Sequence, residues 1–114
     1  MKGLEDAFTI LERNRVNIST VSEWAQLMEY PSSAYFSRRI RTRYRKPPSK
    51  LIQKAKLDLI ASLFIKHPNE IYFFIAIESG FANSQSLSKF VKRATGKTLT
   101  EFKQGVRNRS EKSE

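Results

Sequence analysis

Apolar side chains recur along this chain at the spacing of one face of an α-helix, in segments separated by turn-forming residues. One set stands at i, i+3, i+4 and i+7 and consists of Val21, Trp24, Ala25 and Met28. A second set stands at i, i+4 and i+8 and consists of Phe36, Ile40 and Tyr44. The segment Tyr30-Pro31-Ser32-Ser33 between them breaks the first helix and can cap the second. Because Thr20 and Glu23 form a capping-box pattern before the first set, we predict a helix, a short turn and a second helix here.

The same arrangement returns after 51 positions, where Trp24–Leu51 aligns with Ile75–Phe102. Small, aromatic and apolar positions agree in this register, at Ala25/Ala76, Ser33/Ser84, Ser37/Ser88, Lys46/Lys97, Tyr30/Phe81, Phe36/Leu87 and Ile40/Val91. Agreement of this kind at a fixed period indicates a repeated structural unit.

The second copy predicts its own helix, turn and helix. The first of these starts near Asn69 and turns three side chains inward, namely Tyr72, Ile75 and Ala76. Gly80 supplies the turn, because a positive φ costs glycine least, and either Asn83 or Ser84 caps the next helix. The inner stripe of that helix consists of Leu87, Val91 and Ala94. Gly96 is predicted to end it.

The remaining segments complete an all-helical prediction. Thr98 and Glu101 form a second capping box, which predicts a final short helix. A longer helix is predicted from Pro48 to Ile65, closed by His67-Pro68. The N-terminal segment Leu4–Arg13 is predicted to be helical, with three side chains turned inward: Ala7, Phe8 and Leu11.

No segment alternates apolar and polar residues with the period of a strand, so the predicted fold class is all-α. It consists of two helix-turn-helix subdomains joined by a long linker helix. The predicted divisions are an N-terminal helix with the first unit at 1–47, the linker helix at 48–67, the second unit at 68–104 and a flexible tail at 105–114. The predicted core side chains include Trp24, Phe36, Phe81 and Leu87.

Composition narrows the classes of partner. The 114 residues fit one compact domain or two very small ones, and 21 Lys and Arg against 11 Asp and Glu give a net charge of +10. Such a chain attracts polyanions, either nucleic acid or an anionic membrane. The longest apolar stretch, Ile71–Ile77, is far shorter than the ~20 residues that span a bilayer. With no cysteine present, we expect a cytoplasmic protein without a membrane partner.

Positive charge without acidic residues marks two stretches of the chain, and each contains one of the predicted second helices. No acidic residue occurs from Tyr30 to Leu57, or between Ser79 and Thr100, and many of the acids lie within 4–29. A helix-turn-helix places its second helix in the major groove, so its outer face must be polar and not acidic. The first outer face carries Ser33, Ala34, Ser37, Arg38 and Arg41, and the second carries Ser84, Gln85, Ser88, Lys89 and Lys92. The neighbouring cations, including Arg43 and Lys46, are expected to contact phosphate.

These residues resemble a known family. From about Phe8 to Phe102 the chain is similar to the double helix-turn-helix domain of bacterial AraC/XylS-type transcriptional regulators, which is homeodomain-like. The most specific stretch is IAIESGFANSQSLSKFVKRATGKTLTEFK, residues 75–103, and the first unit matches in AQLMEY and YFSRRI. The resemblance implies that one monomer reaches adjacent major-groove segments of double-stranded DNA. It implies base contacts from Ala34, Ser37 and Arg38 in the first unit, and from Ser84, Gln85, Ser88 and Lys89 in the second.

The chain departs from the family pattern at a few positions. Glu29 and Arg45 stand where the first unit often has glycine, Leu99 replaces a frequent proline, and Ser86 replaces a frequent aromatic residue. Phe90 is bulky at a position that can face the groove, so the second unit is expected either to read bases or to hold mainly phosphate. The separate ligand-sensing domain of many family members is not found in this sequence, which is consistent with a small stand-alone regulator or a fragment.

We therefore predict a sequence-specific regulator of transcription that inserts two recognition helices, with RNA polymerase as a second possible partner. One alternative is a non-specific nucleic-acid-binding protein, which the charge alone supports. Another is a helical adaptor for proteins, whose surface would be Phe73/Phe74 or the acidic N-terminal helix. With one histidine, no cysteine and no nucleophile-base pair, we expect neither an enzyme nor a metal or other cofactor.

Overall fold

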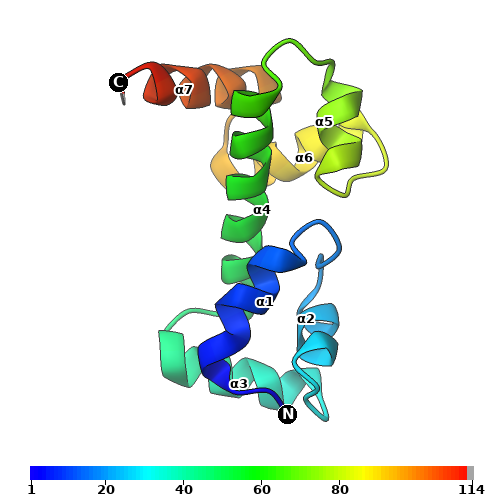
Figure 1. Cartoon of the computed structure of the whole chain (residues 1–114), viewed down its shortest axis with the longest axis vertical. Helices are drawn as coiled ribbons and strands as arrows, with labels where there is room; N and C mark the ends of the chain where they lie inside the picture. The colour runs from blue at the N-terminus through cyan, green and yellow to red at the C-terminus, as the bar shows by residue number, and fades with distance from the viewer. Residues whose placement is uncertain (113–114) are drawn as a thin grey trace. The chain divides into compact units, whose positions relative to one another are not determined.

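The computed structural model describes residues 1–112 of the chain, with side chains up to Arg109, and the described part contains helices and no strand (Figure 1). The elements are a 3₁₀ turn η1 (Leu4–Asp6) and the helices α1 (Ala7–Arg13), α2 (Val21–Leu27), α3 (Ser33–Tyr44), α4 (Pro48–Lys66), α5 (Tyr72–Glu78), α6 (Ser84–Thr95) and α7 (Leu99–Lys112). The predicted all-α class is confirmed. None of the described helices is both long and apolar enough to cross a bilayer.

The chain forms two compact units, and the division between them falls inside α4, after Lys56. The first half of this helix supplies Leu51, Ile52 and Ala55 to the core of the first unit. The second half supplies Leu59, Ile60, Leu63 and Phe64 to the core of the second. The helix that we predicted as a linker at 48–67 is therefore also the last helix of one unit and the first of the next.

The two units repeat each other at the level of helix bounds. Both bounds of α5 and of α6 equal those of α2 and α3 plus 51. The caps follow the same offset, because Ser32 precedes α3 and Asn83 precedes α6, each accepting an amide hydrogen bond with its side chain. Repeated bounds and caps show that the periodicity of the sequence reflects a repeated local structure.

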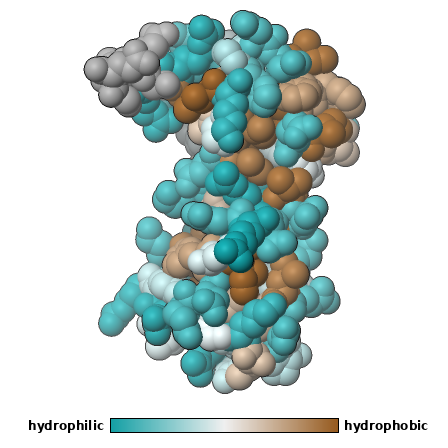
Figure 2. Space-filling model, viewed as in Figure 1, coloured by the Kyte–Doolittle hydropathy of each residue, from teal (hydrophilic) through white to brown (hydrophobic). Residues whose placement is uncertain are grey.

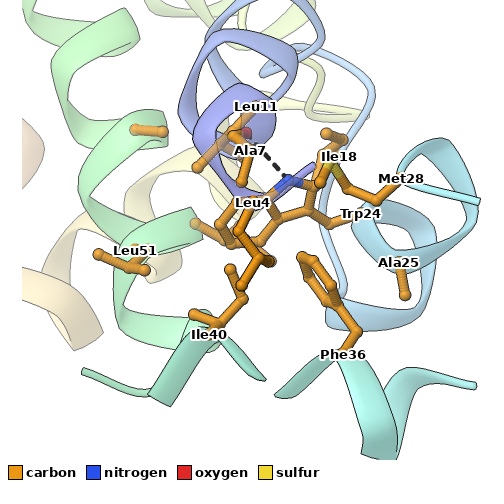
Figure 3. Packing of buried hydrophobic residues seen from close by; sticks show 12 residues of the cluster. Leu4, Ala7, Leu11, Ile18, Trp24, Ala25, Met28, Phe36, Ile40 and Leu51 are labelled. Atoms are coloured by element: carbon orange, nitrogen blue, oxygen red, sulfur yellow. Dashed lines mark hydrogen bonds between the residues drawn. The ribbon is translucent and has the colours of Figure 1, made fainter. Parts of the chain in front are cut away.

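The core of the first unit is built around Trp24 of α2 (Figure 3). Its indole Nε1 donates to the carbonyl oxygen of Ala7 in α1 at 3.2 Å, so the buried polar atom is satisfied. The Phe36 ring of α3 meets the indole edge to face, with 5.1 Å between centroids. At the far end of α3, the Tyr44 hydroxyl donates to Leu4 O at 2.8 Å and holds η1 in place. These contacts join α1, α2 and α3 around one hydrophobic core.

The second unit has a corresponding core with a polar substitution. Ile75 and Ala76 of α5 are fully buried with Leu87 and Val91 of α6. Ser79 stands where the first unit has Met28, and its buried hydroxyl donates to Ile75 O at 2.7 Å. A smaller, internally bonded side chain thus replaces a large apolar one without leaving an unpaired hydroxyl.

Three details of the sequence prediction were wrong. The helix expected from Asn69 begins at Tyr72, because a turn closed by the Glu70 amide on His67 O occupies the preceding residues. Phe8 is 36% exposed, with its ring against Tyr44 at 4.5 Å rather than inside the core. Phe81 is also only partly buried, although it packs against the core of the second unit.

The tail predicted to be flexible at 105–114 is helical as far as Lys112, within α7. Val106 of α7 is 3% exposed and belongs to the core of the second unit. Its burial holds the backbone beyond Gly105 in helical form, although the sequence there is polar. Residues 113–114 of the predicted tail lie outside the described part of the chain.

Candidate nucleic-acid interface

The outer face of α3 begins directly after its cap. Ser32 Oγ accepts from the Tyr35 amide at 3.1 Å, so the capping role considered for Ser33 belongs to its neighbour. Ser33 and Ala34 are exposed in the first turn. Because the N-terminus of a helix presents unpaired amides and a positive partial charge, this end suits contact with an anion.

The predicted contact residues of α3 divide between two sides of the helix. Phe36 and Ile40 are fully buried, and the side facing away from them carries Ser33, Ala34, Ser37, Arg38 and Arg41. Arg43 follows Arg41 by two residues, which is about 200° around the helix, and its guanidinium lies 5.8 Å from the Tyr44 ring centroid. The structure therefore separates Arg43 from the other predicted residues. Lys46 is exposed just beyond the helix.

The arginines on this face have no acidic partner. Among the side chains that the structure describes, residues 1–109, no carboxylate forms an ion pair with Arg38 or Arg41. Glu29, the nearest acid before α3, pairs instead with Lys2 at 3.4 Å. The guanidinium groups thus remain available for an external anion.

On α6 the predicted residues lie on one face. Asn83 Oδ1 accepts from the Ser86 amide at 2.8 Å, which decides the cap in favour of Asn83 over Ser84. Gln85 and Lys89 are exposed, whereas Ser84 and Ser88 are half-buried. The arrangement of exposed and half-buried residues among them matches that of α3 except at the first position, where Ser33 is exposed and Ser84 is half-buried.

The two half-buried serines of α6 border a shallow hollow of about 290 Å³. Its lining comes from the starts of α5 and α7 and from α6: Tyr72, Ser84, Gln85, Ser88, Thr98, Leu99 and Thr100. The hydroxyls of Tyr72 and Thr100 are hydrogen-bonded at 2.9 Å. Tyr72 and Thr100 were not predicted to belong to the site, because only packing brings α5 and α7 beside α6.

Two residues of α6 differ from expectation. The Lys92 ammonium donates to Gly96 O at 3.0 Å, so it closes the C-terminal end of α6 while remaining exposed. Phe90 does not stand in the outer face. It is half-buried, with its ring 5.3 Å from that of Phe81. The bulky side chain therefore packs inward and leaves the outer face to small and polar groups.

Lys56 is removed from the basic surface by burial. It lies within the acid-free stretch of the sequence, yet it is only 3% exposed, and its ammonium donates to Val16 O at 2.9 Å. Burial lowers the pKa of Lys56 to about 8, and the attraction of Glu23 opposes that shift. The helical spacing of Ile52, Ala55 and Lys56 is a signal that could have indicated this.

A stack of Arg39 on two tyrosine rings was not predicted from the sequence. The Arg39 guanidinium lies 6.0 Å from the centroid of the Tyr35 ring, and the Tyr35 ring lies 5.6 Å from that of Tyr30. The i,i+4 spacing of Tyr35 and Arg39 could have indicated the contact. This stack lies beside, and not on, the outer face that carries Arg38 and Arg41.

The structure thus defines an all-α protein of two repeated helical units, each with an exposed helix that carries no acid. Neither the known protein-family models nor the curated proteins give a match to this chain. Within the described residues, no three His, Asp or Glu side chains are grouped as a metal site requires.

Proposed function

We propose that this protein is a sequence-specific, double-stranded-DNA-binding regulator of transcription of the AraC/XylS type, which places α3 and α6 in the major groove. The observation that carries this proposal is the repetition of one surface. In both units a capped helix of 12 residues buries an apolar stripe and carries small and cationic side chains on the other side, to which α6 adds the amide of Gln85. Two such helices have the properties that a recognition helix needs.

Base reading is assigned to residues near the start and middle of each outer face. Arg38 can donate two hydrogen bonds to guanine O6 and N7, and Gln85 can pair with adenine N6 and N7. Serine hydroxyls serve as donor or acceptor, and Ala34 can meet a thymine methyl group. The inward position of Phe90 supports close approach of α6 to the groove, which favours base reading over phosphate contact alone.

Phosphate contacts are assigned to cations farther along or beyond these helices. Arg41, Lys46 and Lys92 are exposed and carry positive charge at the outer faces. Such contacts position the protein without reading sequence. As a monomeric regulator in the cytoplasm, the protein would have RNA polymerase as a second partner.

The decisive experiment is selection of the full chain against a random-duplex library. We expect one motif, or two motifs about one helical turn apart. Arg38→Ala is expected to weaken binding to the selected site by about 1–3 kcal/mol and to relax preference at one position. Arg13→Ala removes the same charge from the exposed end of α1 and serves as the matched control.

The rival is a non-specific nucleic-acid-binding protein, which the net charge of +10 favours. It predicts no enriched motif, and equal loss for Arg38→Ala on selected and random duplexes at physiological salt. Either result would replace the sequence-specific proposal.

A further inference from the structure

The second unit carries an apolar surface that neither its core nor the proposed DNA face uses. Ile71, Phe73 and Ile77 are 69%, 52% and 46% exposed, and together we call them the α5 patch. Figure 2 shows brown and tan surface gathered in the region of α5. Large apolar side chains exposed together, and not singly, mark interaction surfaces.

Packing of α5 does not require these residues. Its inner face is already formed by Ile75, Ala76 and Ser79, all of them buried. The α5 patch lies on other sides of the same short segment. Phe74 is the neighbour that packs, with its ring 5.1 Å from that of His67. The patch therefore adds little to the stability of the folded unit.

The first unit shows what the fold places at these positions when no apolar surface is needed. At the offset of 51, Ile71, Phe73 and Ile77 correspond to Thr20, Ser22 and Gln26, of which the last two are exposed on α2. Two copies of one local structure thus differ by three polar-to-apolar replacements at exposed positions of this segment. The difference points to a contact that only the second unit makes.

The charges beside the patch restrict what can cover it. Glu70 and Glu78 are the only charged residues between Pro68 and Ser88, and both are exposed in a chain of net charge +10. The two carboxylates would repel DNA phosphate. A two-fold contact through the patch would bring the same carboxylates of both copies into one interface, where like charges oppose association.

We propose that the α5 patch is a docking surface for another protein, which presents an apolar helix face flanked by lysine or arginine. The apolar residues of the patch would be buried against the partner's helix, and Glu70 and Glu78 would attract the basic residues that flank that helix. With three anchoring side chains, the contact belongs to the small, transient class of interfaces. This inference is independent of the proposed DNA binding, because the patch and the faces of α3 and α6 share no residue.

The test uses the full isotope-labelled chain and two synthetic peptides of about five helical turns (~18 residues). Both carry a leucine stripe, flanked in one by lysines and in the other by glutamates. We expect saturable chemical-shift changes centred on residues 70–78, and binding of the lysine peptide about tenfold tighter than that of the glutamate peptide. Shifts centred elsewhere, or no preference between the peptides, would overturn the proposal.

The variant Ile71→Thr/Phe73→Ser/Ile77→Gln installs the side chains of the first unit. It should abolish binding of the lysine peptide, with helix content and DNA binding unchanged. Leu27→Gln, which replaces an exposed apolar residue of the first unit, is the matched control and should bind the peptide normally. Full binding by the triple variant would refute the docking surface. A wild-type dimer that the triple variant converts to monomer would make a second copy the occupant and overturn the proposed partner.

Charge reversal tests the acidic rim separately. Glu70→Lys/Glu78→Lys should invert the preference, so that the glutamate peptide binds more tightly than the lysine peptide. Retained preference for lysine would contradict the role given to the two carboxylates.

Discussion

Glu29 and Arg45 hold backbone conformations that normally favour glycine, each with φ of 62°. At the offset of 51 their counterparts are Gly80 and Gly96, with φ of 91° and 78°. The repeated unit thus requires left-handed backbone at these two positions. In the first unit this backbone is strained, because Glu29 and Arg45 each have a Cβ atom. Glu29 also pairs with Lys2, so Arg45 is the position where the backbone strain can be relieved without removing that ion pair.

Arg45→Gly should therefore raise the free energy of unfolding by about 0.5–1 kcal/mol, because relief of left-handed strain exceeds the added entropy of glycine. Urea unfolding measures the change. Arg45→Ala removes the same charge but keeps the strain, so it should give no such gain. Equal stabilisation by both variants would assign the effect to charge.

Lys56 makes the free energy of unfolding depend on pH, and the direction of this dependence follows from its burial. Its folded pKa is about 8, below the ordinary value of 10.5. Below pH 8 the Lys56 amine is protonated in both the folded and the unfolded state, so the folded state bears the full cost of burying its charge. As pH rises from 8 to 10.5, the folded state binds fewer protons than the unfolded state, so this group's unfavourable contribution is relieved.

Lys56→Met should accordingly be more stable than wild type at pH 7, by on the order of 2 kcal/mol, and the advantage should shrink toward pH 10. Chemical unfolding of both proteins at several pH values measures the difference. Lys50→Met, at an exposed position of α4, is the control and should give a difference that stays flat. A Lys56→Met advantage that grew with pH would contradict the burial of the charged amine.

At the scale of the element, α7 shows how tertiary contacts extend a helix through an unfavourable residue. Gly105 lies inside this helix, between the buried side chains Phe102 and Val106. A Cβ atom added at Gly105 would meet nothing closer than Lys97 Nζ at 4.0 Å. The helix continues through Gly105 because its neighbours Phe102 and Val106 are buried. The backbone conformation of Gly105 does not itself require glycine.

Gly105→Ala should raise the stability of the protein by about 0.5–1 kcal/mol, through higher helix propensity. Gly96→Ala, which has open space around it but a positive φ, should lower stability instead. Thermal unfolding of the two variants separates the effects. No effect of Gly105→Ala would mean that the segment is not helical in solution.

At the scale of the whole molecule, charge is distributed by unit and by face. The first unit exposes four arginines along α3, whereas α6 exposes three cations, Lys89, Lys92 and Arg93. If both helices contact DNA, the first unit supplies more of the salt-dependent attraction. The second unit adds the apolar α5 patch with its acidic neighbours.

Arg41→Ala should reduce the slope of log K against log salt by about 1, because one phosphate contact is lost, with affinity falling on all duplexes alike. Arg43→Ala, on the other side of the same helix, removes equal charge and should leave the slope unchanged. Binding measured at several salt concentrations decides between them. A larger change for Arg43→Ala would reverse the assignment of the DNA-facing side.

Much of the local structure follows from the sequence alone. Capping boxes at Thr20 and Thr98, the ends of α3 and α6 and the offset between the units all depend on hydrogen bonds and periodicities within a few residues. The same periodicity predicts which side of each repeated helix is buried. The candidate DNA contacts were chosen as the remaining, outward positions, and most of them are exposed or half-buried on one face.

Other features were decided by tertiary structure, because they depend on which neighbour a side chain meets. Lys56 is buried where its sequence context is basic, and Phe90 packs on Phe81 where it could have faced outward. The polar end of α7 stays helical because Val106 enters a core. The division of the chain inside α4 also comes from packing, since one continuous helix serves two apolar centres. The local sequence determines where the helices form, whereas the tertiary structure determines which side chains of different helices pack together.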